Sequence, residues 1–84
     1  MKINFTERAW DEYLYWQQTD RAQLKRINAL IRDIQRDGFE GIGKPEPLGY
    51  EFQGHWSRRI DAEHRLVYKI LEEGLLIVQC RYHY

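Results

Sequence analysis

The 84-residue sequence contains one cysteine, no long apolar run and no excess of either charge. A single cysteine, Cys80, excludes an intrachain disulfide. No stretch approaches the ~20 apolar residues that cross a bilayer. The amino terminus turns polar at Thr6, Glu7 and Arg8, which does not fit a signal peptide. These absences predict one soluble, cytoplasmic domain over residues 1–84.

The balance of charge restricts how the protein can meet nucleic acid. Basic and acidic residues number 13 each, which argues against binding free nucleic acid by phosphate neutralisation alone. A local basic patch is still compatible with this balance, because segment 56–65 combines three arginines with two acids, namely Arg58, Arg59, Arg65, Asp61 and Glu63. If the substrate is RNA, another component has to help present it.

The first half of the chain has a strand pattern followed by two helix patterns. Residues 2–5 alternate as a short strand does. One helix is predicted from a Thr6 cap to about Gln18, and a second from an Asp20 cap to a stop at Gly38. The short link between them predicts a helical hairpin.

The second half of the chain is strand-like. Glycines and prolines make 39–48 a loop. A short strand near 50–53 is then one interpretation, and three further strands are predicted at 56–60, 64–71 and 75–82. The whole order predicts an α+β fold, in which an antiparallel sheet carries the N-terminal helical hairpin on one face.

Helical spacing also predicts which side chains are buried. The first helix places on one face Trp10, Tyr13, Leu14 and Gln17. Tyr15 and Trp16 point elsewhere, and such an exposed aromatic pair is typical of a partner interface. The second helix has an apolar stripe of Leu24, Ile27, Leu30, Ile31 and Ile34.

Two kinds of site are disfavoured by the pattern. His55, His64 and His83 lack the paired spacing of zinc ligands, and a strand would place Cys80 and His83 on opposite faces. Cys80 itself lies in an apolar strand, which is typical of a buried, inert thiol. The sequence therefore predicts neither a metal site nor a cysteine nucleophile.

Glu46 and Arg65 are the first candidates for chemistry. Glu46 stands between Pro45 and Pro47, whose rings stiffen the backbone on both sides of the carboxylate. Arg65 lies on a strand face, where its planar fork suits a phosphate, and Arg59 can add a second contact. Glu63 is expected to pair with either arginine. The alternative is a solvated loop charge and an ordinary polar strand face.

His83 and Tyr84 follow the last strand directly. Histidine titrates near neutrality, so His83 can donate a proton at cellular pH. Tyr84 can stack on a base. The alternative interpretation is a frayed tail without a role.

Several motifs along the whole chain resemble the YoeB-type toxins of the RelE superfamily. They are Trp10-Asp11, Tyr13-Leu14-Tyr15-Trp16, Phe39-Glu40-Gly41, Gly43-Lys44-Pro45-Glu46-Pro47-Leu48, Trp56-Ser57-Arg58-Arg59-Ile60, Glu63-His64-Arg65-Leu66-Val67-Tyr68 and Cys80-Arg81-Tyr82-His83-Tyr84. The match is specific, because broader RelE relatives share the fold without the Glu and His pair. One departure is Gly49, where relatives often carry a basic residue.

The resemblance implies a metal-free endoribonuclease that cuts messenger RNA in the ribosomal decoding site, needs no cofactor and is silenced by a YefM-type antitoxin. It implies Glu46 as general base, Arg65 as the cation at the phosphate and His83 as general acid. Tyr84 would position the substrate, Arg59 would assist at the phosphates, and Glu63 is expected to support these contacts.

Two other hypotheses stay open at this point. A non-catalytic RelE- or ParE-like toxin would block a protein target such as gyrase and would need neither Glu46 nor His83. A passive module would bind its partner through Tyr15 and Trp16. A homodimer through the aromatic helix is compatible with either.

Overall fold

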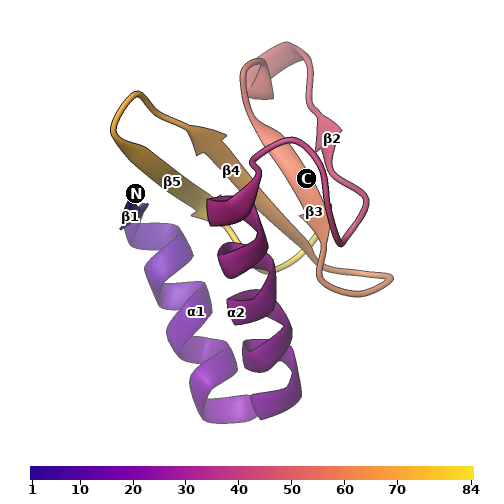
Figure 1. The fold of residues 1–84 in the computed structure, drawn as a ribbon. Helices are drawn as coiled ribbons and strands as arrows, with labels where there is room; N and C mark the ends of the chain where they lie inside the picture. Colours follow the sequence, from indigo (N-terminus) through magenta and orange to yellow (C-terminus); the bar gives the residue numbers. More distant parts are fainter.

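The computed structural model describes residues 1–84 as a helical hairpin on a five-stranded sheet (Figure 1). In chain order the elements are β1 (Lys2–Phe5), α1 (Glu7–Thr19), α2 (Arg21–Arg36), β2 (Glu46–Pro47), the 3-10 helix η1 (Tyr50–Phe52), β3 (Trp56–Arg59), β4 (Arg65–Ile70) and β5 (Gly74–Gln79). The predicted α+β architecture is confirmed.

The strands lie in the order β1-β5-β4-β3-β2. The sheet is mostly antiparallel, as predicted, and the exception is β1, which pairs parallel with β5. A parallel neighbour requires a long crossover connection. The helical hairpin and the rest of the sheet supply that connection between β1 and β5.

The helices begin where the sequence predicts. The Thr6 hydroxyl accepts the Ala9 N–H at 3.1 Å, and the Asp20 carboxylate accepts the Gln23 N–H at 3.1 Å. Asp20 is also the single residue between the two helices, which fixes them as a tight hairpin. Neither helix has the length and hydropathy of a membrane span.

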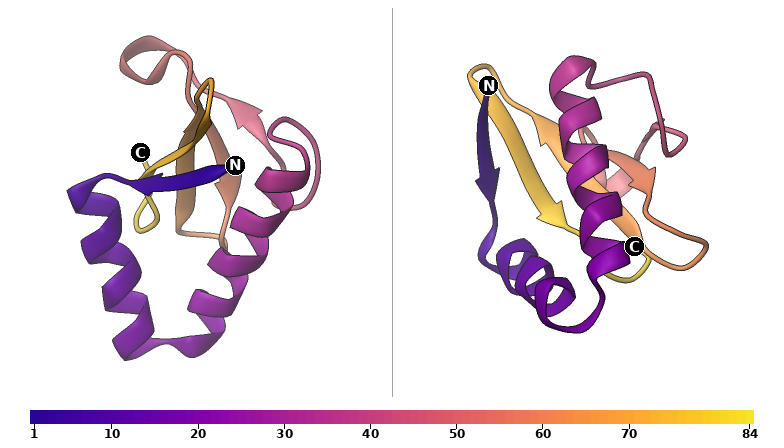
Figure 2. Two further views of the ribbon diagram at one scale, coloured as in Figure 1. Left: turned by 60° about the vertical axis from the view of Figure 1, so that its left-hand side comes forward. Right: turned by 60° about the horizontal axis from the view of Figure 1, so that its bottom comes forward.

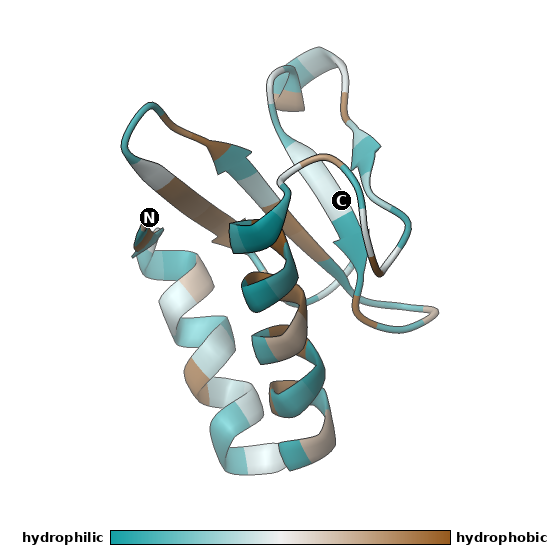
Figure 3. Cartoon of the chain, viewed as in Figure 1, coloured by the Kyte–Doolittle hydropathy of each residue, from teal (hydrophilic) through white to brown (hydrophobic).

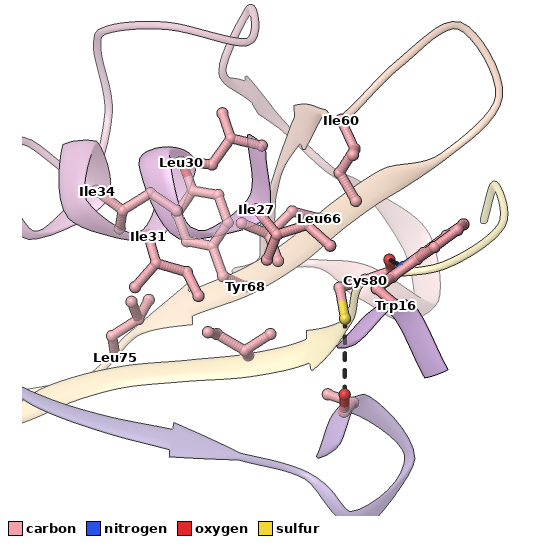
Figure 4. Packing of buried hydrophobic residues seen from close by; sticks show 12 residues of the cluster. Trp16, Ile27, Leu30, Ile31, Ile34, Ile60, Leu66, Tyr68, Leu75 and Cys80 are labelled. Atoms are coloured by element: carbon pink, nitrogen blue, oxygen red, sulfur yellow. Dashed lines mark hydrogen bonds between the residues drawn. The ribbon is translucent and has the colours of Figure 1, made fainter. Parts of the chain in front are cut away.

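One apolar core lies between the hairpin and the sheet (Figures 3 and 4). The predicted stripe of α2 supplies its centre through Ile27, Leu30, Ile31 and Ile34, which are all buried. From the sheet, the core receives Leu66, Tyr68, Leu75, Ile77 and Cys80. The opposite face of the sheet carries no helix.

The predicted face of α1 is only partly confirmed. Tyr13 is half-buried and packs against the core. Trp10 is exposed, and the buried residues of α1 are Ala9, Glu12 and Trp16. Trp16 and Glu12 both bind the backbone of Cys80, directly after β5. Trp16 Nε1 donates to the Cys80 carbonyl and Glu12 Oε1 accepts the Cys80 N–H, each at 2.8 Å. Apolar periodicity does not detect a face that is buried through hydrogen bonds.

The exposed pair predicted on α1 is therefore reduced to one residue. Trp16 is only 7% exposed, while Tyr15 lies at the surface beneath the guanidinium of Arg81, whose Cζ is 3.6 Å from the ring centroid. The aromatic surface of α1 is formed instead by Trp10 and Tyr13, which stack on each other and contact Phe5.

Three predictions for the second half of the chain also differ from the structure. Within the predicted loop 39–48, Glu46–Pro47 forms the short strand β2, because it pairs with β3. Segment 50–53 forms the 3-10 helix η1, because Tyr50 adopts a φ of 53°, outside the strand region. The last strand ends at Gln79, three residues earlier than predicted, since the chain then turns away as a tail. This tail is residues 80–84.

Candidate active site

Strand register places three candidate side chains on the face without helices. Glu46 pairs with Ser57, and Arg59 pairs with Arg65. Paired residues of a sheet present their side chains to the same face, and residues two apart on one strand share a face. Arg58, between them, points to the helices. Glu46, Arg59 and Arg65 therefore share what we call the open face.

The tail reaches the same face. Tyr84 Oη lies 3.4 Å from Ser57 Oγ, the register partner of Glu46. In the left view of Figure 2, α2 and the C-terminal end lie on opposite sides of the strands. The tail residues His83 and Tyr84 are thus brought to the side of the sheet that carries the carboxylate and both arginines. The Tyr84 contact holds the end of the tail against the sheet.

A β-bulge makes the attachment of the tail polar. Val67 pairs with Gln79 but Tyr68 pairs with Ile77, so Val78 is an extra residue in β5. The bulge reverses the alternation and turns Gln79 to the open face. There its side-chain amide donates to the carbonyls of Arg81 and Tyr82, at 3.3 and 3.4 Å. A lone polar residue in an apolar strand was the sequence signal for this contact, which the pattern analysis missed.

The tail then turns sharply at Tyr82. Its backbone has a φ of 69°, and its N–H donates to His64 Nδ1 at 2.7 Å. Its carbonyl accepts the Arg65 N–H at 3.0 Å. Both backbone groups of Tyr82 are therefore held by the start of β4, directly before His83.

Beyond this turn, His83 and Tyr84 remain accessible to a substrate. Both side chains are exposed, and their ring centroids are 4.6 Å apart. His83 Nδ1 is 3.0 Å from the Tyr84 carbonyl, and Nε2 has no partner within the chain. Tyr84 also contacts Phe52 of η1, at a centroid distance of 6.2 Å.

Arg65 is oriented by the turn between β3 and β4. Its Nη1 donates to the carbonyls of Asp61, Ala62 and His64, while Nε and Nη2 make no hydrogen bond within the chain. The turn is stabilised by the Asp61 carboxylate, which accepts the N–H groups of Glu63 and His64. The turn thus fixes Nη1, while Nε and Nη2 are free to bind a ligand.

The ionisation of Asp61 reflects this turn. Burial raises its pKa, but hydrogen bonds from the His64 backbone, the Gln23 side chain and the Glu63 backbone outweigh burial and leave the pKa below 3.8. Asp61 therefore stays charged and keeps the turn closed at neutral pH.

Glu63 does not pair with an arginine, contrary to expectation. Its Oε1 lies 3.3 Å from His64 Nε2, and the side chain is otherwise exposed. Arg65 contacts the other acidic residue of the turn, Asp61, through the backbone carbonyl of Asp61.

Arg58 is not part of a basic patch. It is fully buried on the helix side and forms an ion pair with Asp33 of α2 at 2.5 Å. Its guanidinium also donates to the Tyr68 hydroxyl and to the carbonyls of Asp37, Glu40 and Ile42. All these carbonyls belong to the loop before Glu46, so Arg58 clasps that loop onto the sheet.

The loop is also tied down immediately before the carboxylate. Gly43 has a φ of 81°, which favours glycine, and its carbonyl accepts the Arg59 N–H at 2.7 Å. A Cβ at this position would stand 2.8 Å from Leu30 of the core. The chain then enters β2 through Pro45, so Glu46 starts from a fixed point.

Cys80 behaves as predicted. It is fully buried, its Sγ lies 3.6 Å from the Ala9 carbonyl (Figure 4), and burial raises the pKa of the thiol to about 12. The thiolate needed of a nucleophile is therefore suppressed. No three side chains of His, Cys, Asp or Glu converge as a metal site would need.

The one surface groove of the molecule lies elsewhere. It has a volume of about 470 Å³ and is lined by residues of β1, α1 and α2, among them Phe5, Trp10 and Tyr13. None of its lining residues belongs to β2, β3, β4 or the tail. The open face is therefore an exposed surface rather than a deep pocket.

Comparison with known proteins identifies the family of the chain. Residues 5–84 match the family described as the YoeB-like toxin of bacterial type II toxin-antitoxin systems. The chain belongs to the YoeB toxin family. The Toxin YoeB of Synechocystis is 61% identical over 84 residues, which cover all of this chain and 98% of that protein. The Toxin YoeB of Escherichia coli K12 is 57% identical over the full length of both.

Solved structures of YoeB proteins share the fold. The YoeB/ParE toxin of Agrobacterium tumefaciens gives a TM-score of 0.97 at 50% identity, with all of both chains covered. A YoeB dimer from Staphylococcus aureus gives 0.94 at 46% identity, covering all of this chain and 98% of that one. A YoeB–YefM complex of the same species gives 0.93 at 45% identity, with the same coverage.

Proposed function

We propose that this YoeB-family toxin is an endoribonuclease that cuts messenger RNA presented by the ribosome, without a metal ion. The observation that carries the proposal is that strand register and the Tyr84–Ser57 contact place a carboxylate, two arginines and the His83–Tyr84 tail on one face of the sheet. Cleavage of an RNA phosphodiester by its own 2′-hydroxyl needs a base, an acid and a cation between them. This face has one candidate for each.

Glu46 is the proposed general base. Its carboxylate would take the proton of a ribose 2′-hydroxyl as that oxygen attacks the adjacent phosphorus. Glu46 is exposed on a short edge strand that two prolines and the Arg58 clasp hold in place. A base held this firmly loses little entropy when the substrate binds.

Arg65 is the proposed cation at the phosphate. The unpaired Nε and Nη2 would donate to the non-bridging oxygens, where negative charge increases in the transition state. Arg59, exposed on the same face, would bind a neighbouring phosphate, and the exposed carboxylate of Glu63 would contact the substrate at the rim.

His83 is the proposed general acid. As the bond from phosphorus to the 5′-oxygen breaks, His83 would protonate that oxygen, leaving a 5′-hydroxyl and a 2′,3′-cyclic phosphate. Tyr84 would position the RNA, with its ring supported by Phe52 and its hydroxyl by Ser57. The exposed ring faces are suited to stacking on a base.

The proposed partners follow from the charge and the family. The open face is exposed and the chain has zero net charge, so the ribosome is the component that would hold the RNA. The S. aureus YoeB–YefM complex and YoeB dimer support a YefM-type antitoxin and a homodimer as partners of this chain.

Induced expression followed by primer extension tests the proposed function. We expect growth arrest together with new 5′ ends on messenger RNA. These ends should fall at a constant position within the codons of the reading frame. Arrest with DNA damage and intact messenger RNA would instead support a gyrase-directed toxin. Absence of arrest would support a passive binding module.

Adding residues after Tyr84 is expected to impair cleavage. Tyr84 lies against Ser57 and Phe52, and His83 Nδ1 lies near the Tyr84 carbonyl, so an added segment would crowd the acid. A Gly-Ser segment there should lower the rate ~10-fold or more, as misplaced catalytic groups do. The same segment placed before Met1, which is exposed, is the control. Equal rates for both extended proteins would contradict the prediction.

A further inference from the structure

His64 is a buried histidine outside the proposed chemistry, and it contacts the tail directly. It is 8% exposed, and its ring stands edge-on to the Trp16 indole at a centroid distance of 4.9 Å. Its Nδ1 accepts the Tyr82 N–H at 2.7 Å. This is the shortest of the hydrogen bonds that hold Tyr82, whose next neighbour is His83.

The contacts of the ring determine its protonation state. Because the Tyr82 N–H is a donor, Nδ1 must carry a lone pair, so Nε2 carries the proton of the neutral ring. Nε2 faces the Glu63 carboxylate at 3.3 Å. A doubly protonated ring would set an N–H against the Tyr82 N–H, two donors at hydrogen-bond distance.

We infer that His64 is a positioning residue, whose neutral imidazole holds Tyr82 so that His83 and Tyr84 stay on the open face. Protonation of His64 releases this hold and disorders the catalytic tail. The inference rests on the proposed nuclease function for its effect on rate, but the hold itself does not depend on that function.

The surroundings of His64 come from the turn before β4, from β4 itself, from the tail and from α1. The turn before β4 contributes the carboxylates of Glu63 and Asp61, and β4 contributes Arg65. The tail contributes the Tyr82 ring, at a centroid distance of 6.0 Å, and Arg81, which lies over Trp16. Helix α1 contributes only the uncharged Trp16. Glu63 forms the one ion pair of the ring, at Nε2, so a proton on Nδ1 is the event that changes the bond to Tyr82.

Three substitutions separate the acceptor from the packing of the ring. His64→Asn keeps an acceptor oxygen near the place of Nδ1, His64→Gln reaches the place of Nε2 instead, and His64→Phe keeps the ring without an acceptor. We expect kcat/KM for cleavage of ribosome-bound messenger RNA to fall ~10- to 100-fold in His64→Phe and His64→Gln, because His83 and Tyr84 both lose their position. His64→Asn should restore most of the wild-type rate. Because asparagine does not titrate, the rate of this variant should also fall less at acid pH. Wild-type rates in His64→Phe would overturn the inference.

A measurement on the unmodified protein needs no activity. NMR of the imidazole nitrogens follows the protonation of His64, while hydrogen exchange follows the Tyr82 amide. We expect the amide to lose protection over the same pH range in which Nδ1 gains its proton, and to show no such step in His64→Asn. Protection that is independent of His64 protonation would overturn the inference, even if the protein proves not to cleave RNA. If the wild type shows the coupled titration but does not cleave RNA, only the proposed function is contradicted.

Discussion

Glu46→Gln and His83→Gln are each expected to lower the rate of messenger RNA cleavage by ~10²- to 10⁴-fold, the usual contribution of a general base or acid. Both side chains are exposed, so neither substitution removes packing, and the melting temperature should not change. Rates are measured on ribosomes stalled on a defined messenger RNA.

Glu72→Gln provides the matched control for the carboxylate. It makes the same chemical change at an exposed position in the turn between β4 and β5, away from β2 and the tail. This variant should cleave like the wild type. A Glu46→Gln protein that cleaves as fast as Glu72→Gln would show that Glu46 is only a solvated loop charge.

Arg58→Ala is expected to have the largest effect on stability. The guanidinium makes five hydrogen bonds at full burial, to a carboxylate, a hydroxyl and three carbonyls. Removing one partner of a buried ion pair typically costs ~3–5 kcal/mol. A domain of this size is stable by only ~0.05–0.15 kcal/mol per residue. At ~4–8 °C per kcal/mol, the melting temperature should fall by at least ~12 °C.

Arg59→Ala is the matched control for this loss of stability. It removes the neighbouring arginine of the same strand, whose side chain is exposed on the open face. Its melting temperature should stay close to that of the wild type. Arg58→Lys should remain strongly destabilised, because an ammonium group cannot reproduce the planar fork. Similar melting temperatures for Arg58→Ala and Arg59→Ala would contradict the clasp.

Acid should weaken the same clasp. Hydrogen bonds from Arg36, from the Ile42 backbone and from Arg58 lower the pKa of Asp33 from 3.8 to about 2. Because the folded-state pKa is the lower one, the contribution of Asp33 is fully present above its unfolded pKa. It is lost as the pH falls through the folded value. Stability should therefore decline between about pH 4 and pH 2, and Asp33→Asn should flatten that part of the curve.

Local patterns in the sequence predicted what local physics controls. Thr6 and Asp20 cap their helices as expected, and the stripe of α2 is buried because a spacing of three and four residues leaves one apolar face. The α+β class follows from these elements alone.

The errors arose where burial depends on a partner far along the chain. Glu12 and Trp16 are buried because their polar atoms meet the backbone of Cys80, more than sixty residues away. Arg58 lies in a basic segment, which predicts an exposed side chain. In the structure, α2 and the loop before β2 accept the hydrogen bonds of its guanidinium. No window of sequence around either residue contains the groups that satisfy it.

For the candidate site, the sequence by itself determined the chemical types: a proline-flanked acid, a strand arginine and a histidine after the last strand. Only the tertiary structure decided that they share a face. One extra residue in β5 turns Gln79 to the open side, and His64 then fixes Tyr82, so the tail crosses the sheet toward Glu46. The physical reason is that alternation along a strand is local, whereas the phase of that alternation and the path of the tail are determined by hydrogen bonds between strands.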